Sequence, residues 1–217
     1  MRKVYPNGTV AAPTTTKSPP SDENKAFVLT VWKKSLLFNC NGFTVYDDKG
    51  DLVFRVDNYM QGHKGQILLM DAAGKPLLTF RRKKLSFGEN WLVYDGETDI
   101  NPAFSVRKKV NILNKCLAHV SRISCEHNGT GSSPSSNNKK KNLMYEIQGS
   151  YAQRSCAVHD GKRRIVAEIK KKEAVGGVAF GVDVFRLIVY PEIDTAVAMA
   201  LVILLDQMFG SSRRFSS

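Results

Sequence analysis

Two pairs of cysteine and histidine are the residues of this chain that could hold a metal ion. Cys116 and His119 are separated by two residues, and Cys125 and His127 by one. Two thiolates and two imidazoles are a common tetrahedral zinc set. The spacing departs from the usual zinc motifs, however, and all four residues are explained as ordinary strand residues. The sequence therefore favours structural roles, and we expect no metal and no other cofactor.

Motifs for nucleotide binding and catalysis are absent from the sequence. It contains no GxxxxGK[ST] loop, no GxSxG elbow and no HExxH helix. The glycine-rich run of residues 176–181 lacks the GxGxxG spacing and is typical of a turn. The histidines and aspartates form no catalytic constellation. We therefore expect that the protein is not an enzyme.

Basic residues leave one kind of chemistry open, the binding of anions. The 217 residues include 32 Lys and Arg against 20 Asp and Glu, a net charge of +12. Each basic residue close to an anionic membrane contributes about 1 kcal/mol to binding. The predicted anionic-lipid or partner-binding residues are Lys33, Lys34, Arg81, Arg82, Lys83, Lys84, Arg107, Lys108, Lys109, Lys170, Lys171 and Lys172. Two further basic runs are Lys139-Lys140-Lys141 and Arg163-Arg164.

Other interpretations of these runs stay open. Lysines and arginines at strand ends also protect sheets from edge-to-edge aggregation without binding anything. A nucleic-acid partner fits the charge, but no basic helix or aromatic stacking motif supports it. A carrier of small ligands would need a cavity inside the fold.

A repeated pattern places many of the basic runs at the ends of strands. The segment 43–55 reads as apolar strand, Asp/Gly turn, apolar strand and basic residue, and it is echoed in 67–81, 91–107 and 156–170. Asp and Gly suit tight hairpins. In the last unit, the alternation predicts that Ile165, Ala167 and Ile169 share one face, opposite Val166, Glu168 and Lys170. About a dozen antiparallel strands follow from this pattern.

One helix is predicted at about 194–209. Asp194 offers an N-cap and Gly210 a stop, and the run 196–205 is apolar on every side. A membrane span needs about 20 apolar residues, so we expect a buried core helix and no integral membrane span. A sheet that closes into a barrel around this helix would satisfy both elements, whereas an open sandwich would leave the helix partly exposed.

The domain organisation follows from composition. We expect a flexible tail at 1–24, a single barrel domain at 25–210 with a low-complexity loop at 128–142, and a short tail at 211–217. No apolar leader or lipidation motif is present, which favours a cytoplasmic protein with reduced cysteines.

Three segments resemble the plant LURP-one-related family. They are Leu29-Thr-Val-Trp-Lys-Lys-Ser-Leu36, the stretch 43–59, and the carboxyl-terminal segment that runs from Asp183-Val-Phe to Asp206-Gln-Met-Phe209. The resemblance covers nearly all of 25–209. It implies a tubby C-terminal-like fold, shared with the phospholipid scramblases, in which twelve strands surround a C-terminal helix. It also implies a role linked to plant defence, with relatives that include membrane-tethered transcription regulators that bind phosphoinositides.

The chain departs from its wider relatives at the calcium site of the scramblases. The corresponding region, 178–183, holds one carboxylate, which cannot supply the six or more oxygens that Ca²⁺ prefers. Calcium-activated lipid scrambling is therefore not expected. We predict a monomeric, non-catalytic protein that binds anionic phospholipid, including phosphoinositide, or a protein partner. Its place would be the cytoplasm, at the inner face of the plasma membrane, or the nucleus; nucleic-acid binding and ligand carriage are the alternatives.

Overall fold

A computed structural model describes residues 25–34, 42–59, 66–83, 88–111, 113, 115–123, 142–174, 176–177 and 179–210. The two predicted tails, nearly all of the low-complexity loop, Lys84 and Lys139-Lys140-Lys141 lie outside the described residues.

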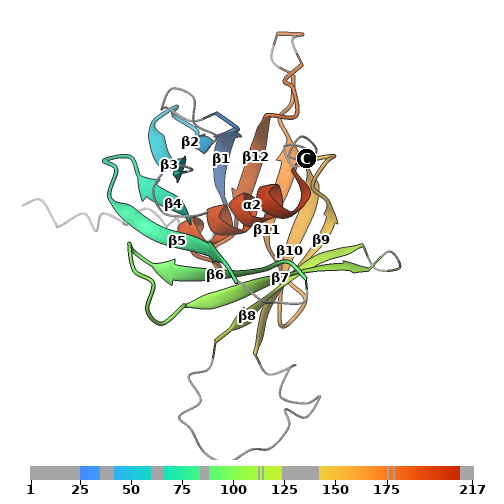
Figure 1. Ribbon diagram of the computed structural model, residues 1–217. Helices are drawn as coiled ribbons and strands as arrows, with labels where there is room; N and C mark the ends of the chain where they lie inside the picture. The colour runs from blue at the N-terminus through green and yellow to red at the C-terminus, as the bar shows by residue number, and fades with distance from the viewer. Residues whose placement is uncertain are drawn as a thin grey trace, which may run out of the picture.

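Twelve strands form a closed antiparallel barrel, as Figure 1 shows. Each strand pairs with its neighbours in sequence, and β1 closes the barrel against β12. The strands are β1 (Phe27–Trp32), β2 (Gly42–Tyr46), β3 (Leu52–Tyr59), β4 (Gln66–Asp71), β5 (Pro76–Arg82), β6 (Asn90–Asp95), β7 (Phe104–Asn111), β8 (Cys116–Arg122), β9 (Leu143–Ser150), β10 (Ser155–Asp160), β11 (Ile165–Lys171) and β12 (Val184–Val189). The predicted fold class, a closed barrel of about twelve strands, is confirmed.

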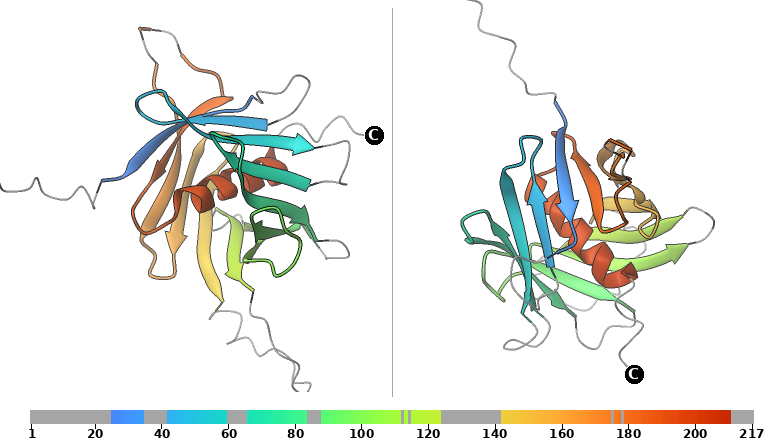
Figure 2. Two further views of the ribbon diagram at one scale, coloured as in Figure 1. Left: turned by 90° about the vertical axis from the view of Figure 1, so that its left-hand side faces the viewer. Right: turned by 90° about the horizontal axis from the view of Figure 1, so that it is seen from above.

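The helix α2 (Thr195–Phe209) runs through the interior of this barrel, as both views of Figure 2 show. Its residues from Ala198 to Leu205 are all buried, and they pack with the inward side chains of the strands in one core. An all-round apolar helix is stable only when it is surrounded, which the barrel achieves. The open-sandwich alternative is therefore wrong. Among the described residues, no helix has the length and apolarity that crossing a membrane requires.

Both ends of α2 are held by the residues that the sequence indicated. Asp194 is the N-cap, and its carboxylate accepts a hydrogen bond from Val197 N at 3.0 Å. Gly210 N donates to Asp206 O at 2.7 Å. Gly210 has an ordinary φ of −66°, so it is needed for space, since an added Cβ would clash with that carbonyl oxygen.

The aspartates of the repeated pattern build hairpin turns at one end of the barrel. The Oδ1 atoms of Asp47, Asp71 and Asp160 accept backbone N–H groups two or four residues farther along the chain, at 2.8–2.9 Å. The first two turns end in a glycine with φ near +90°. In the third, Arg163 takes the equivalent place with φ +64°. Asp rather than Gly is therefore the constant element of this turn.

The predicted faces of β11 need one correction. Val166 and Ala167 are both buried, whereas Ile165 is 44% exposed. The register shifts at this point, because Val158 faces Ala167 while His159 faces Ile165. The bulge inserts Val166 as an extra residue and turns it inward. Glu168 and Lys170 lie on the outer face, as expected.

Candidate functional site

Four of the predicted basic runs lie at the same end of the barrel. All neighbouring strands are antiparallel, so the odd-numbered strands point one way and their carboxyl ends meet at one end. The runs follow or end β1, β5, β7 and β11, and we call this end of the barrel the basic end. Its predicted residues are Lys33, Lys34, Arg82, Lys83, Arg107, Lys108, Lys109, Lys170, Lys171 and Lys172.

Two lysines of the basic end anchor the carboxyl terminus of α2. Lys33 Nζ lies 2.9 Å from Asp206 Oδ1, which also accepts from the Tyr151 hydroxyl at 3.2 Å. Lys108 Nζ donates to the carbonyl oxygen of Met208 at 2.8 Å. Positive charge at this position also stabilises the negative end of the helix dipole. Lys33 and Lys108 are therefore structural residues.

The Tyr151 hydroxyl stays protonated in this arrangement. Burial and the adjacent Asp206 carboxylate raise the pKa of Tyr151 well above its ordinary value of 10.0. The hydroxyl therefore remains a donor to Asp206 at any physiological pH. The anchor consists of one ion pair and one neutral hydrogen bond that share a single carboxylate oxygen.

Lys170 is also occupied by a partner inside the protein. Its Nζ lies 2.9 Å from Glu168 Oε2, and the hydrogen bond to this carboxylate raises the pKa of Lys170. Burial would raise the pKa of Glu168, but the hydrogen bonds from Lys170 and the Tyr190 hydroxyl outweigh it, so the pKa is lowered. Both groups are charged near neutral pH.

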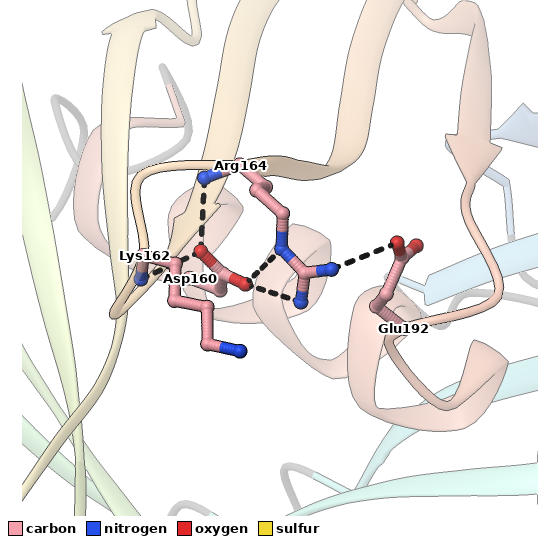
Figure 3. Close-up of polar contacts among 4 residues, drawn as sticks. All are labelled: Asp160, Lys162, Arg164 and Glu192. Atoms are coloured by element: carbon pink, nitrogen blue, oxygen red, sulfur yellow. Dashed lines mark hydrogen bonds and ion pairs between the residues drawn. The ribbon is translucent and has the colours of Figure 1, made fainter.

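Arg81, next to Arg82 on β5, is occupied by partners inside the protein. Its guanidinium donates to Asp99 Oδ2 at 3.0 Å and to Gln66 Oε1 at 3.3 Å, and it lies over the ring of Tyr94. Asp99 belongs to the connection between β6 and β7, which lies at the hairpin end. Arg163 and Arg164 also lie at that end, in the turn between β10 and β11 that Figure 3 shows.

Five of the predicted cations at the basic end are exposed, and within the described part of the chain neither an ion pair nor an aromatic ring engages them. They are Arg82, Lys83, Arg107, Lys109 and Lys171. Three of them flank the start of β6, since Arg82 pairs with Trp91, Arg107 pairs with Asn90, and Lys83 N donates to Asn90 O. We call these five residues the open cations.

Exposed apolar side chains lie at the same end of the barrel as the open cations. Trp32 is 41%, Phe180 39% and Leu113 97% exposed. Lys34 Nζ lies 5.1 Å from the centre of the Trp32 ring, and Lys172 Nζ lies 5.5 Å from that of Phe180. Tryptophan and cationic side chains together are typical of surfaces that meet the headgroup region of a membrane.

Sequence reasoning missed Lys115 and Arg154, which lie at the same end. Lys115 is exposed immediately before β8. Arg154 is buried, and its guanidinium lies 4.2 Å from the ring centre of Tyr151 and 4.3 Å from that of Phe185, while Nε donates to Val182 O at 2.8 Å. Lys115 could have been predicted, because even-numbered strands begin at the basic end and this residue directly precedes β8. Nothing in the sequence indicates that Arg154 is buried.

Comparison with known proteins supports the fold and identifies the family. The family model described as LURP-one-related matches residues 27–206. Protein LURP-one-related 8 of Arabidopsis thaliana is 54% identical over 217 residues, which cover 98% of this chain and 100% of that protein. Protein LURP-one-related 17 of the same plant is 45% identical and covers 84% of this chain and 83% of its own length.

A solved structure has the same fold. The X-ray structure of an Arabidopsis thaliana protein aligns with a TM-score of 0.58 at 23% identity and covers 84% of this chain and 90% of its own. The resemblance seen in the three sequence segments is confirmed by these matches. This chain belongs to the LURP-one-related family.

Proposed function

We propose that the protein binds anionic membrane surfaces, including phosphoinositide-containing ones, through the basic end of its barrel. The observation that carries this proposal is that the open cations lie at the same end of the barrel as the exposed rings of Trp32 and Phe180. Cations draw the barrel to anionic headgroups, and the aromatic rings enter the interface. The binding is reversible and sensitive to salt, because exposed charges are screened.

The barrel interior supports binding over ligand carriage. The helix α2 fills the space along the barrel axis with buried side chains, so a ligand carrier would have to expel its own core. The protein acts without catalysis as a peripheral membrane adaptor. Its family points to plant defence, and its place of action is the cytoplasmic side of the plasma membrane or the nucleus.

Cosedimentation with liposomes tests this proposal. The wild-type protein should pellet with vesicles that contain phosphatidylserine or phosphatidylinositol 4,5-bisphosphate, and stay in solution with neutral phosphatidylcholine. The triple variant Arg82→Ala, Arg107→Ala, Lys109→Ala removes three open cations at about 1 kcal/mol each, so the affinity should fall about 100-fold.

The matched control removes the same charge from the other end of the barrel. The variant Lys49→Ala, Lys75→Ala, Lys162→Ala alters three exposed lysines of hairpin turns, and we expect it to keep at least half of the wild-type binding. Equal losses of vesicle binding in the two triple variants would contradict the proposal, because net charge and not the basic end would then determine the affinity. Pelleting with neutral vesicles would contradict the proposal, as would tighter binding to duplex DNA than to anionic vesicles.

A further inference from the structure

Three side chains of different chemistry meet on the outside of the barrel, and none of them belongs to the open cations. They are the Cys116 thiol and the His119 imidazole of β8, and the Glu146 carboxylate of β9. One ligand atom from each residue lies within 4.8 Å of the other two. Sulfur, nitrogen and carboxylate oxygen are all ligands that Zn²⁺ takes in proteins.

A β-bulge brings the thiol and the imidazole to one face. Residues three apart in a regular strand point to opposite faces. Here the register shifts between Cys116 and Ala118, so Leu117 and Ala118 both pack with the core. Cys116 is thereby turned outward, beside Glu146, although it is only 2% exposed. The bulge explains why an i, i+3 pair on a strand shares one site.

The spacing of these atoms is close to that of a tetrahedral zinc site. Zinc bonds of about 2.0–2.3 Å place neighbouring ligand atoms about 3.3–3.8 Å apart. His119 Nε2 lies 3.9 Å from Glu146 Oε2. Small side-chain rotations would bring all three atoms to bonding distance. Gln148 Nε2 donates to Glu146 Oε1 at 2.8 Å and so fixes the carboxylate with its other oxygen toward His119.

His119 is ready to bind a metal ion, whereas Cys116 must first lose its proton. Burial, together with Lys109, lowers the pKa of His119, so the imidazole is neutral and keeps a lone pair at neutral pH. Burial and the Glu146 carboxylate raise the pKa of Cys116, so this group is a thiol without metal. On binding, the S–H bond breaks, a Zn–S bond forms, and the proton passes to solvent.

We propose that Cys116, His119 and Glu146 form a Zn²⁺-binding site on the outer face of β8 and β9. The fourth position of the ion is left to water or an external ligand, as in other zinc sites with three protein ligands. A groove of about 270 Å³ is lined by residues adjacent to the three ligands, including Lys115, Gln148 and His159. The sequence suggested Cys125 and His127 as the partners of Cys116 and His119, but that pair lies outside the described residues. In the proposed site, the Glu146 carboxylate takes their place.

Zinc titration of the full-length, metal-free protein tests the site directly. Competition with a chromophoric chelator should give one Zn²⁺ per chain, and Co²⁺ in its place should show a thiolate-to-cobalt charge-transfer band. Cys116→Ser should remove that band. Cys116→Ser and His119→Gln should each weaken Zn²⁺ binding about 100-fold, and Glu146→Gln about 10-fold. Circular dichroism of each metal-free variant verifies that the barrel is folded.

Two matched variants separate this ligand set from its neighbours. His159→Gln changes a histidine of the next strand, which pairs with Glu146, and it should keep Zn²⁺ affinity within about twofold. Cys125→Ser should likewise leave the affinity unchanged. Lys109→Gln should strengthen binding a few-fold, because its charge repels the cation.

The proposal is overturned if the protein binds no Zn²⁺ at micromolar concentration. It is equally overturned if binding is lost with Cys125→Ser or His159→Gln and retained with Cys116→Ser. Since Glu146 is a partly exposed surface residue, its variant keeps the test decisive even if Cys116→Ser fails to fold.

Discussion

The two ends of the barrel use the same kinds of charged residue in opposite ways. At the hairpin end, aspartates bind the backbone of their own turn, and Arg164 pairs with Asp160 four residues away and with Glu192 (Figure 3). At the basic end, Lys170 pairs with Glu168 in its own strand, but Lys33 reaches across the fold to Asp206. The hairpin end uses its charges to build turns, whereas the basic end uses Lys33 and Lys108 to hold α2 and leaves the open cations without an ion pair.

This difference separates charge that stabilises the fold from charge that is available for binding. A basic run is a poor predictor of a binding residue by itself, because Lys108 serves the helix while Lys109, its neighbour, is exposed. The useful question is whether the fold supplies an acceptor within reach. At the basic end, that acceptor is mostly the carboxyl end of α2.

The largest stability effect is expected where the basic end holds the helix. Asp206→Ala removes the partner of Lys33 and of the Tyr151 hydroxyl in a poorly exposed setting, so the free energy of unfolding should fall by about 2–3 kcal/mol. Urea unfolding at pH 7 measures this loss. Tyr151→Phe, which keeps the ion pair, should cost less than half as much. A loss below 1 kcal/mol for Asp206→Ala would mean that the helix end needs no long-range anchor.

A smaller effect is expected at the opposite end of the same helix. Asp194→Ala removes the N-cap hydrogen bond to Val197 N and should lower the free energy of unfolding by about 1 kcal/mol. Asp194→Asn, which can still accept this bond, should restore most of the stability. If Asp194→Ala costs as much as Asp206→Ala in the same urea experiment, the two ends of α2 are held equally and the contrast between them fails.

The smallest effect is expected in the turn of Figure 3, and it depends on pH. Slight desolvation acts to raise the pKa of Asp160, but hydrogen bonds from Arg164 and Lys162 lower it below the ordinary value of 3.8. Its stabilising contribution is therefore present above that value and lost as pH falls through the lowered pKa.

The variant Asp160→Asn isolates this titration. Thermal unfolding should show a lower Tm than wild type at pH 7 and a shrinking difference as the pH is taken below 3.8. A difference that stays constant down to the lowest pH would assign the effect to turn geometry and not to the charge. The Asp47→Asn variant offers a comparison in a turn of the same design.

Much of the fold could be predicted, because strand alternation and the Asp/Gly turns are local signals. The helix limits followed from Asp194 and Gly210, and closure followed from an apolar helix that needed cover on every side. Faces were predicted wrongly where a bulge adds one residue, as at Val166, since no local residue type marks a bulge. The same limit hid the neighbourhood of Cys116 and Glu146, which depends on the bulge at Leu117.

The candidate site was only partly predictable. The basic runs were visible in the sequence, and their common end follows from strand direction once the barrel is accepted. The sequence did not indicate that Arg81 is unavailable for binding. Its partners Asp99 and Gln66 are far from it in the sequence and come close only when the strands pair. Partner availability is a property of tertiary structure, and a single sequence does not display it.

The position of α2 after all twelve strands has a consequence for synthesis of the protein. A ribosome delivers the barrel wall first and the centre of the core last, and β1 cannot close against β12 until that late strand emerges. The inner faces of the earlier strands therefore stay uncovered until β12 and α2 have been synthesised, and exposed apolar surface of this kind makes a folding intermediate prone to aggregation.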